Sequence, residues 1–382
     1  MINKIQLSKF RNFIAKTVNF DEGITVIVGP NASGKTNILE SLFLLSSGKS
    51  FHARLEEEMI DYASDIARVK CQIANALSAQ AGKLQNTNLE VVLTRGEIEI
   101  AKNKFEKTPR KRLLVNGVGK RLLDFAGNFK VVLFGPWDLE LVTESPSVRR
   151  KFMDTVLSQV DRDYRRASLS YDKGLRQRNK LLWQIRENFS NYSQTTGRAR
   201  LLFWDRLLIK NGDTISKKRQ EFIEFVNQTK DFSGQNFSLE YDKSAISEAR
   251  LEQYAYEEVA AATTLVGPHR DDIILKIKDQ KSKTRLPDEQ VKTKERELAR
   301  YGSRGEQRMG VLWLKLAELA FIEKTTGEKP TLLLDDIFSE LDHEHRDIVM
   351  KIAKGQQTII STADPHYVKD FGKIKKIELS GS

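Results

Sequence analysis

The sequence has a single cysteine and no long apolar run. Because Cys71 stands alone among 382 residues, no disulfide can form within the chain. The first segment, MINKIQLSKFRNF, lacks the apolar core of a signal peptide. No later segment approaches the roughly 18 uncharged residues of a membrane-spanning helix. We therefore expect a protein of the reducing cytoplasm with no membrane partner.

Histidine is also scarce, and the chain lacks long heptad repeats. Only five histidines occur, and neither they nor Cys71 stand at zinc-ligand spacing, so GPHRDD at 267–272 does not indicate a zinc site. Apolar heptads are not sustained over many turns, which excludes a long coiled coil. A chain of this length can instead form two or three compact domains with full cores.

Basic residues outnumber acidic ones, and the excess is local. The chain has 63 Lys and Arg against 52 Asp and Glu, a net charge of +11. Residues 141–230 hold 19 of the basic and 10 of the acidic side chains. Such a cluster fits binding to a polyanion such as nucleic acid. A solvated helical surface that is merely rich in basic residues remains the alternative.

The pattern of apolar residues predicts an α/β protein whose two ends form one domain. Short β-branched strands are expected at 2–7 and 24–28, with a helix after Lys35. Near the C-terminus the sequence predicts a helix at 306–324 and then a strand, a helix and a strand, at 331–336, 343–354 and 357–362. We therefore predict one composite domain from residues 1–140 and 265–382.

The middle of the chain predicts two further parts. An antiparallel β lobe is expected between residues 66 and 135, from the segments ARVKCQIA, LEVVLTR, KRLLVNG and FKVVLF. The alternating strand pattern is absent from residues 141–264, where the sequence predicts a basic α-helical arm domain, with Ser145-Pro146 as a helix start. The segment 273–278, IILKIK, predicts a strand, and the charged segment 279–296 predicts a loop.

A phosphate-binding loop follows the strand at 24–28. The segment GPNASGKT at 29–36 fits the pattern G-x-x-x-x-G-K-[ST] between a strand and a helix. Its glycines allow a tight turn that points N–H groups at phosphate oxygens. Lys35 is predicted to bridge the β- and γ-phosphates of ATP and Thr36 to hold Mg²⁺. The predicted nucleotide-binding residues of this segment are Gly29, Asn31, Ala32, Ser33, Gly34, Lys35, Thr36 and Asn37.

Two acids end the apolar strand at 331–336. Asp335 has the position of a Walker B aspartate, which holds Mg²⁺ beside a phosphate loop. Asp336 is then placed to orient or deprotonate the attacking water, so we predict Asp336 and Lys35 as the catalytic residues. Asp342 is a candidate nucleotide contact and also a good helix cap, and both roles remain open.

The segment YGSRGEQR at 301–308 stands at the start of the predicted helix 306–324. Its Ser303, Gly305 and Glu306 precede or open a helix whose N-terminal N–H groups form an anion site. This is the form of the signature motif in ABC-type ATPases, in which serine and glycine meet the γ-phosphate of a nucleotide held by another subunit. An incidental helix cap is the alternative.

The motifs together resemble the RecF family, bacterial DNA-repair ATPases related to SMC proteins. The resemblance covers nearly the whole chain and is carried by LSKFRNF (7–13), GPNASGKTN (29–37), DLELVTESPSVRRKFMD (138–154), QRNKLL (177–182), LVGPHRDDI (265–273), YGSRGEQR, LLLDDIFSELD (332–342) and QTIIST (357–362). It implies an ABC-type P-loop ATPase head with an inserted β lobe and a helical arm. Arg11 and Asn12 match positions that contact the nucleotide in such ATPases; an exposed arginine after a strand is the alternative.

The resemblance also implies a mechanism and partners. ATP-dependent homodimerisation would close Ser303 and Gly305 of one protomer over Lys35 and Asp335 of the other. The dimer would bind gapped or junction DNA, act with RecR and RecO so that RecA is loaded on single strands, and hydrolyse ATP weakly with DNA stimulation. The chain departs from the family pattern at Ala32-Ser33, at Arg304-Gly305-Glu306, and at Trp137, where the family usually has an acid.

Two other functions are compatible with the residues. An SMC-like regulatory or nuclease-associated ATPase could use the basic arm to grip RNA or protein, and salt-dependent binding to gapped duplex against RNA would separate the two. The motor subunit of a transporter would need a membrane partner. The long helical insert argues against it, as does the position of His366, too far beyond Thr362 for the histidine switch of transporters.

Overall fold

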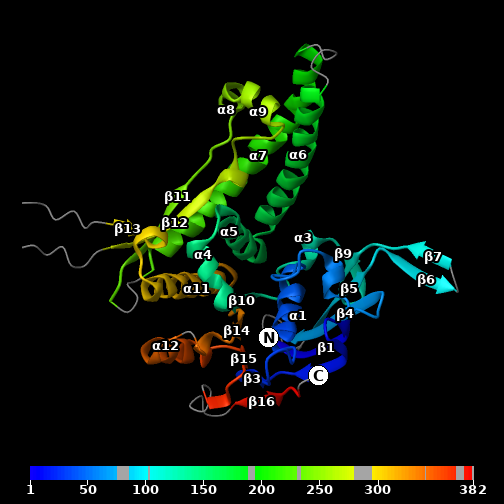
Figure 1. Ribbon diagram of the computed structural model, residues 1–382, viewed down its shortest axis with the longest axis vertical. Helices are drawn as coiled ribbons and strands as arrows, with labels where there is room; N and C mark the ends of the chain where they lie inside the picture. The colour runs from blue at the N-terminus through cyan, green and yellow to red at the C-terminus, as the bar shows by residue number, and fades with distance from the viewer. Residues whose placement is uncertain are drawn as a thin grey trace, which may run out of the picture. The chain divides into compact units, whose positions relative to one another are not determined.

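The structure is a computed structural model, and it describes residues 1–74, 86–101, 104–187, 194–229, 234–278, 295–339, 341–366 and 374–380. The contacts divide the chain into two compact units (Figure 1), the first made of Met1–Asp138 and Ile322–Ser382 and the second of Leu139–Phe321. The predicted domain boundary at 140 lies close to this division, whereas residues 265–321 contact the helical unit. The assignment of that stretch to the ATPase head stays a prediction. Residues 279–294 of the predicted loop lie outside the described residues.

A parallel sheet joins the two ends of the chain in the first unit. Its strand order is β10 (Val131–Phe134), β14 (Thr331–Asp335), β15 (Thr358–Thr362), β3 (Ile24–Val28) and β16 (Lys375–Glu378). All residues of the first four strands are buried, as expected for parallel strands inside an α/β fold. The helices α1 (Lys35–Ser47) and α12 (His343–Ala353) follow β3 and β14 in sequence.

One strand prediction is wrong. We placed FKVVLF in the antiparallel lobe, but β10 pairs in parallel with β14. The physical reason is visible in the segment: Val131–Phe134 is a continuous apolar run buried at every position, which suits a strand covered on both faces.

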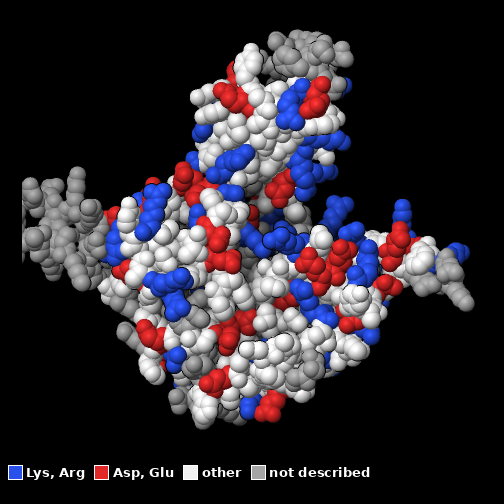
Figure 2. Space-filling model, viewed as in Figure 1, with Lys and Arg blue, Asp and Glu red and all other residues white. Residues whose placement is uncertain are grey.

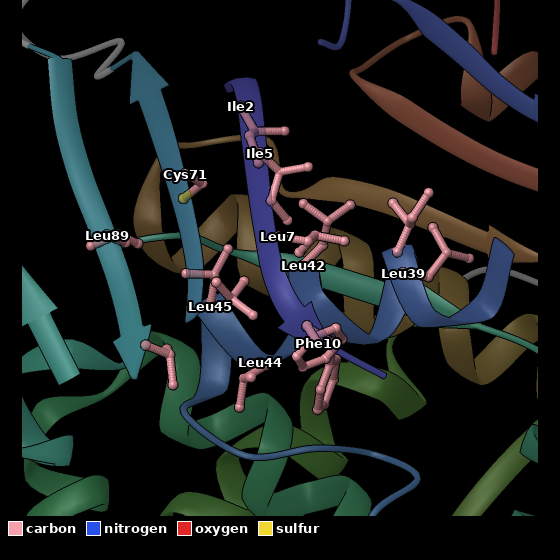
Figure 3. Close-up of a cluster of buried hydrophobic side chains, with 14 of the residues drawn as sticks. Ile2, Ile5, Leu7, Phe10, Leu39, Leu42, Leu44, Leu45, Cys71 and Leu89 are labelled. Atoms are coloured by element: carbon pink, nitrogen blue, oxygen red, sulfur yellow. The ribbon is translucent and has the colours of Figure 1, made fainter. Parts of the chain in front are cut away.

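The predicted antiparallel lobe is a six-stranded sheet. Its order is β2 (Phe13–Asn19), β1 (Ile2–Phe10), β4 (Ile66–Ala74), β5 (Asn86–Thr94), β8 (Lys111–Val115) and β9 (Val118–Lys120). Alternate side chains of β1, β4 and β5 are buried, and α1 supplies apolar side chains to the same core, as Figure 3 shows for Leu42 and Leu45 beside Ile5 and Leu7. The strands β6 (Glu97–Ala101) and β7 (Lys104–Lys107) form a separate hairpin, and α3 (Leu122–Phe125) is a single turn.

The second unit is mainly helical. Its helices are α4 (Glu140–Thr143), α5 (Pro146–Val160), α6 (Arg162–Glu187), α7 (Gln194–Asn227), α8 (Glu248–Gln253), α9 (Ala255–Ala261), α10 (Leu298–Tyr301) and α11 (Arg304–Thr326), whose last turns belong to the first unit. A three-stranded sheet has the order β11 (Phe237–Asp242), β12 (Asp272–Lys278) and β13 (Glu295–Glu297).

The strand β11 was not predicted from the sequence. It lies inside the stretch read as helical, because FSLEYD is too short for its alternation to stand out. Its pairing with β12, about 35 residues later in the chain, supplies the hydrogen bonds that make it a strand. Within the described residues no helix is long and apolar enough to span a bilayer, and no group of His, Cys, Asp and Glu has the arrangement of a metal site.

Candidate functional site

The segment between β3 and α1 folds back on itself as a phosphate loop does. Gly34 has φ 94° and Ala32 has φ 66°, so the chain passes twice through left-handed conformations. A Cβ on Gly34 would lie 2.6 Å from the ring of Phe13, and a Cβ on Gly29 would lie 2.7 Å from the carbonyl oxygen of Leu379. Both glycines are therefore required by the close approach of neighbouring chain.

The polar atoms of this loop suit an anion. Lys35 is 8% exposed, and its Nζ donates to the carbonyl oxygens of Gly29 and Pro30 at 2.8 and 2.9 Å. The buried Ser33 Oγ has no hydrogen-bond partner among the described residues. An ammonium bound only to carbonyl groups and an orphaned hydroxyl, both at the N-terminus of α1, fit the phosphates of a nucleotide. Asn31 and Ala32 are exposed beside them.

The structure brings the predicted magnesium ligands together. The carboxylate of Asp335, at the end of β14, accepts a hydrogen bond from the hydroxyl group of Ser361. Burial raises the pKa of Asp335, and the hydroxyl groups of Ser361 and Thr36 oppose that rise. A buried carboxylate beside the hydroxyl of Thr36 is the oxygen pair that Mg²⁺ takes in phosphate-loop proteins. The prediction missed Ser361, because its place beside Asp335 comes from the pairing of β14 with β15.

Asp336 and Asp342 follow Asp335 with different geometry. Asp336 has φ 50°, its N–H donates to Ser361 O at 3.0 Å, and its own carbonyl accepts from Ser339 Oγ at 2.8 Å. A non-glycine residue in this strained conformation, beside Asp335, is typical of a functional position. Asp342 caps α12, since its Oδ1 accepts from the backbone N–H of His345 at 3.0 Å. The capping role of Asp342 is thus observed, and its contact with nucleotide stays a prediction.

Arg11 forms a largely buried ion pair with Glu40. Its guanidinium forms two hydrogen bonds of 2.7 Å with the carboxylate of Glu40 on α1 and one of 2.7 Å with the carbonyl oxygen of Glu58. Glu40 is 1% exposed, and no local pattern indicates this pair because its partners are 29 residues apart. The neighbouring Asn12 accepts from Asn37 Nδ2 at 2.9 Å. In this structure Arg11 therefore braces the β1–β2 turn, and its contact with nucleotide stays a prediction.

The signature-like segment forms a reciprocal helix cap in the second unit. The Ser303 N–H donates to Glu306 Oε2 at 2.8 Å, and the Glu306 N–H donates to Ser303 Oγ at 3.3 Å. Glu306 also pairs with Arg296 at 2.5 Å, and these hydrogen bonds lower its pKa against the raising effect of burial. Ser303, Arg304 and Gly305 are exposed, and a Cβ on Gly305 would meet open space. The helix start can thus receive an anion or a partner subunit.

Two other segments singled out in the sequence have structural roles. In GPHRDD, the fully buried Asp271 accepts from Arg219 Nη1 at 2.9 Å and from the hydroxyl of Tyr241, while Asp272 pairs with Arg149 Nε at 2.6 Å. These bonds join helices to β12 in the second unit, and the guanidinium of Arg149 is paired within the protein. In the first unit the ring of Trp137, where the family usually has an acid, stacks on Phe51 with centroids 4.9 Å apart.

Comparisons with known proteins find relatives along nearly the whole chain. The model of the RecF/RecN/SMC N terminal domain matches residues 1–380. The DNA replication and repair protein RecF of Herpetosiphon aurantiacus is 33% identical over 95% of this chain and 93% of its own, and that of Halothermothrix orenii is 34% identical over 95% and 92%.

Solved structures show the same fold. A structure of the recombination mediator protein RecF with ATPrS in the RecFOR pathway superposes with a TM-score of 0.80 at 28% identity, covering 99% of this chain and 96% of its own. The Smc head domain of Pyrococcus furiosus, at a TM-score of 0.51 and 16% identity over 99% of this chain and 93% of its own, shares the ABC-type head fold alone. From residue 1 to residue 380, this chain belongs to the RecF family of the SMC-related ATPases.

Proposed function

We propose that this chain binds ATP at the loop 29–36 and dimerises upon binding it. The observation that carries the proposal is that the hydroxyl of Thr36 and the charge of Lys35 both act on the buried carboxyl of Asp335, so the two predicted magnesium ligands lie together beside Lys35. The related RecF structures determined with ATP and with ATPrS support the same ligand. Mg²⁺ held there would neutralise charge on the β- and γ-phosphates.

The residues of this chain then have distinct roles. Lys35 would exchange its two loop carbonyls for phosphate oxygens, and Ser33 Oγ would gain a partner. Asp336 would orient the attacking water or accept its proton, with weak hydrolysis resetting the dimer. Ser303 and Gly305 of a second protomer would complete the site, since both are exposed at a helix N-terminus, whose dipole favours an anion.

We further propose that the ATP-bound dimer binds gapped or junction DNA and, with RecR and RecO homologues, helps to load RecA on single strands. The support is membership of the RecF family and the excess of basic residues between 141 and 230. A regulatory ATPase with an RNA or protein target is the competing function, and DNA stimulation of the ATPase is part of our proposal.

Sedimentation with and without ATP and gapped DNA tests the proposal. We expect the wild-type chain to shift from monomer to dimer with ATP, and to bind gapped duplex more tightly than RNA or blunt duplex with strong salt dependence. Ser303→Arg should bind ATP and remain monomeric. Gly305→Arg is the matched variant, because it leaves the Ser303–Glu306 cap intact and places the new side chain in open space. Unaltered dimerisation of both variants would refute the role of a second protomer.

A further inference from the structure

The long helices α6 and α7 form an antiparallel pair with one open side. Three contacts show that the helices are antiparallel: Tyr164 with Arg219, Gly174 with Leu207, and Arg178 with Asp205. Residue numbers along α6 increase where those along α7 decrease. Core residues of α7 recur on one face, with Leu208, Ile215 and Phe222 at most 3% exposed. A second face of α7 is left to line a groove of about 1100 Å³ against α6.

This groove has the dimensions of a helix site. On α7 its lining residues recur every three or four positions from Ala199 to Thr214. At 1.5 Å per residue this stripe is about 22 Å long, which equals about four turns of a docked helix. On α6 the lining runs from Asp163 to Ser170 with the same spacing. By the antiparallel contacts given above, these α6 residues lie beside the Thr214 end of the stripe, so α7 lines the length of the groove and α6 flanks one end of it. A docked helix would pack along the α7 stripe.

The floor of the groove is apolar and partly open. Ala167 lies at its base on α6, and Leu202, Phe203 and Leu207 line it from α7. Leu202 is 47% and Phe203 is 64% exposed, because both line a groove that the α6–α7 pair does not fill. Adjacent exposed apolar side chains of this size, set in a concave surface, are typical of a docking site for a protein.

The rim of the groove is basic. Arg166, Arg206 and Lys210 line it against a single acid, Asp163, and that acid is already paired with Arg166 at 2.8 Å. Arg206 and Lys210 make no ion pair with any described residue. Figure 2 shows basic side chains gathered along α6 on the same unit. The positive charges of Arg206 and Lys210 therefore favour an occupant that carries carboxylates.

We propose that the α6–α7 groove binds an amphipathic helix of a partner protein, with an apolar face against Leu202 and Phe203 and with Glu or Asp residues opposite Arg206 and Lys210. The lining favours this occupant over single-stranded nucleic acid, because Phe203 is the one aromatic ring among its described residues and successive bases need successive stacking platforms. The groove uses basic residues of the segment 141–230 that also supports the proposed DNA function, and it goes beyond that function because its occupant is a protein helix.

A designed peptide tests the proposal on the full chain. The probe is a fluorescein-labelled helix of about 16 residues with Leu at i, i+3, i+4 and i+7 and Glu on the flanks, read by fluorescence anisotropy. A peptide of the same composition in scrambled order keeps the charge and loses the apolar face. We expect the patterned peptide to bind at least about tenfold more tightly than the scrambled one.

Four variants locate the binding. Phe203→Asp and Arg206→Glu should each weaken the patterned peptide by about tenfold or more. The matched controls Tyr256→Asp, on α9, and Lys243→Glu, after β11, alter an exposed ring and an exposed lysine of the same unit outside the groove and should leave binding unchanged. Thermal unfolding by circular dichroism checks that all variants fold, and Phe203→Ser replaces Phe203→Asp if the latter does not.

Several results would overturn the proposal. Equal binding of the scrambled peptide would show attraction by charge alone. Unchanged binding by both groove variants would place the peptide elsewhere. If the peptide fails to bind while labelled oligo-dT loses affinity in the groove variants alone, the groove is a nucleic-acid site. If the variants instead abolish a wild-type dimer that forms without ATP, a second copy of the chain covers it.

Discussion

At the scale of single residues, the buried carboxyl group of Asp335 serves ligand binding at a cost in folding stability. Its folded pKa is raised because burial penalises the charged form. A raised carboxyl pKa contributes stability that is fully present below the unfolded pKa near 3.8 and is lost as the pH rises through the folded value. At neutral pH the ionised Asp335 is therefore a cost to folding that a bound cation would offset.

Asp335→Asn should change the stability of the free chain and its stabilisation by ligand in opposite directions. The free variant should be as stable as the wild-type chain or more stable, because an amide keeps an oxygen that can accept from Ser361 and removes the buried charge. Its stabilisation by saturating ATP and Mg²⁺, about 2.7 kcal/mol for a ligand at a hundred times its Kd, should be lost. Thermal melts with and without ligand measure both effects. A variant that melts lower without ligand and gains as much with it would contradict the assignment.

The pair of Arg11 and Glu40 leads to the opposite prediction. Glu40→Gln breaks a buried bidentate pair and also alters the hydrogen bond that Ser50 donates to Glu40, so it should lower the free energy of unfolding by about 2 kcal/mol or more. Urea unfolding measures the loss. The double variant Arg11→Met with Glu40→Met should recover much of it, whereas additive losses in this double-mutant cycle would show that the two side chains do not act as a pair.

At the scale of helices and strands, the sequence predicted regular elements well and their partners poorly. The strand at 24–28 and the helix after Lys35 were predicted at the observed positions, because apolar period and phosphate-loop residues are local signals. The sheet that holds β10, the strand β11 and the pair of Arg11 with Glu40 depend on residues distant in the sequence, which no local pattern reports. In the candidate site, Thr36 and Asp335 were predicted together from their motifs, but Ser361 was missed because its role comes from strand pairing.

The motif GPHRDD yields a prediction at this scale. His269 Nδ1 lies 2.9 Å from the hydroxyl of Tyr171, and its Nε2 lies 3.0 Å from Thr264 O. Burial lowers the pKa of His269 to about 4, and the charge of Arg270 acts in the same direction. A base whose folded pKa is depressed contributes stability that is present above the unfolded value near 6.5 and is lost as the pH falls towards 4.

The pH dependence of unfolding tests this role. Between pH 6.5 and 4 the wild-type chain should lose up to about 3 kcal/mol through His269 alone. His269→Gln keeps an acceptor and a donor but does not titrate, so its stability should fall less steeply over the same range. His366→Gln is the control, since His366 is exposed. Parallel pH profiles for wild type and His269→Gln would show that His269 is not held neutral by the fold.

At the scale of the whole molecule, the first unit depends on both ends of the chain. The N-terminal strand β3 lies between the C-terminal strands β15 and β16, and a single side chain ties further segments together. Gln357 Nε2 donates to Ile2 O at 2.7 Å and to Asp21 O at 2.9 Å. Its Oε1 accepts from the N–H of Ile2 at 2.8 Å and from Thr331 Oγ1 at 3.0 Å. Gln357 thus joins β1, the turn before β3 and β14.

Replacing this side chain should therefore weaken segments that are far apart in the sequence. Gln357 is 4% exposed, so Gln357→Ala leaves several buried polar groups without a partner and should cost about 3 kcal/mol in the free energy of unfolding. Hydrogen exchange should show that the backbone amides of β1 and of β14 both lose protection in this variant, because the side chain of Gln357 bonds to both strands. Gln6→Ala, on the exposed side of β1, is the control and should change little. If exchange rises at Ile2 but not at Thr331, the two ends open independently, and the first unit is not one cooperative structure built from both termini.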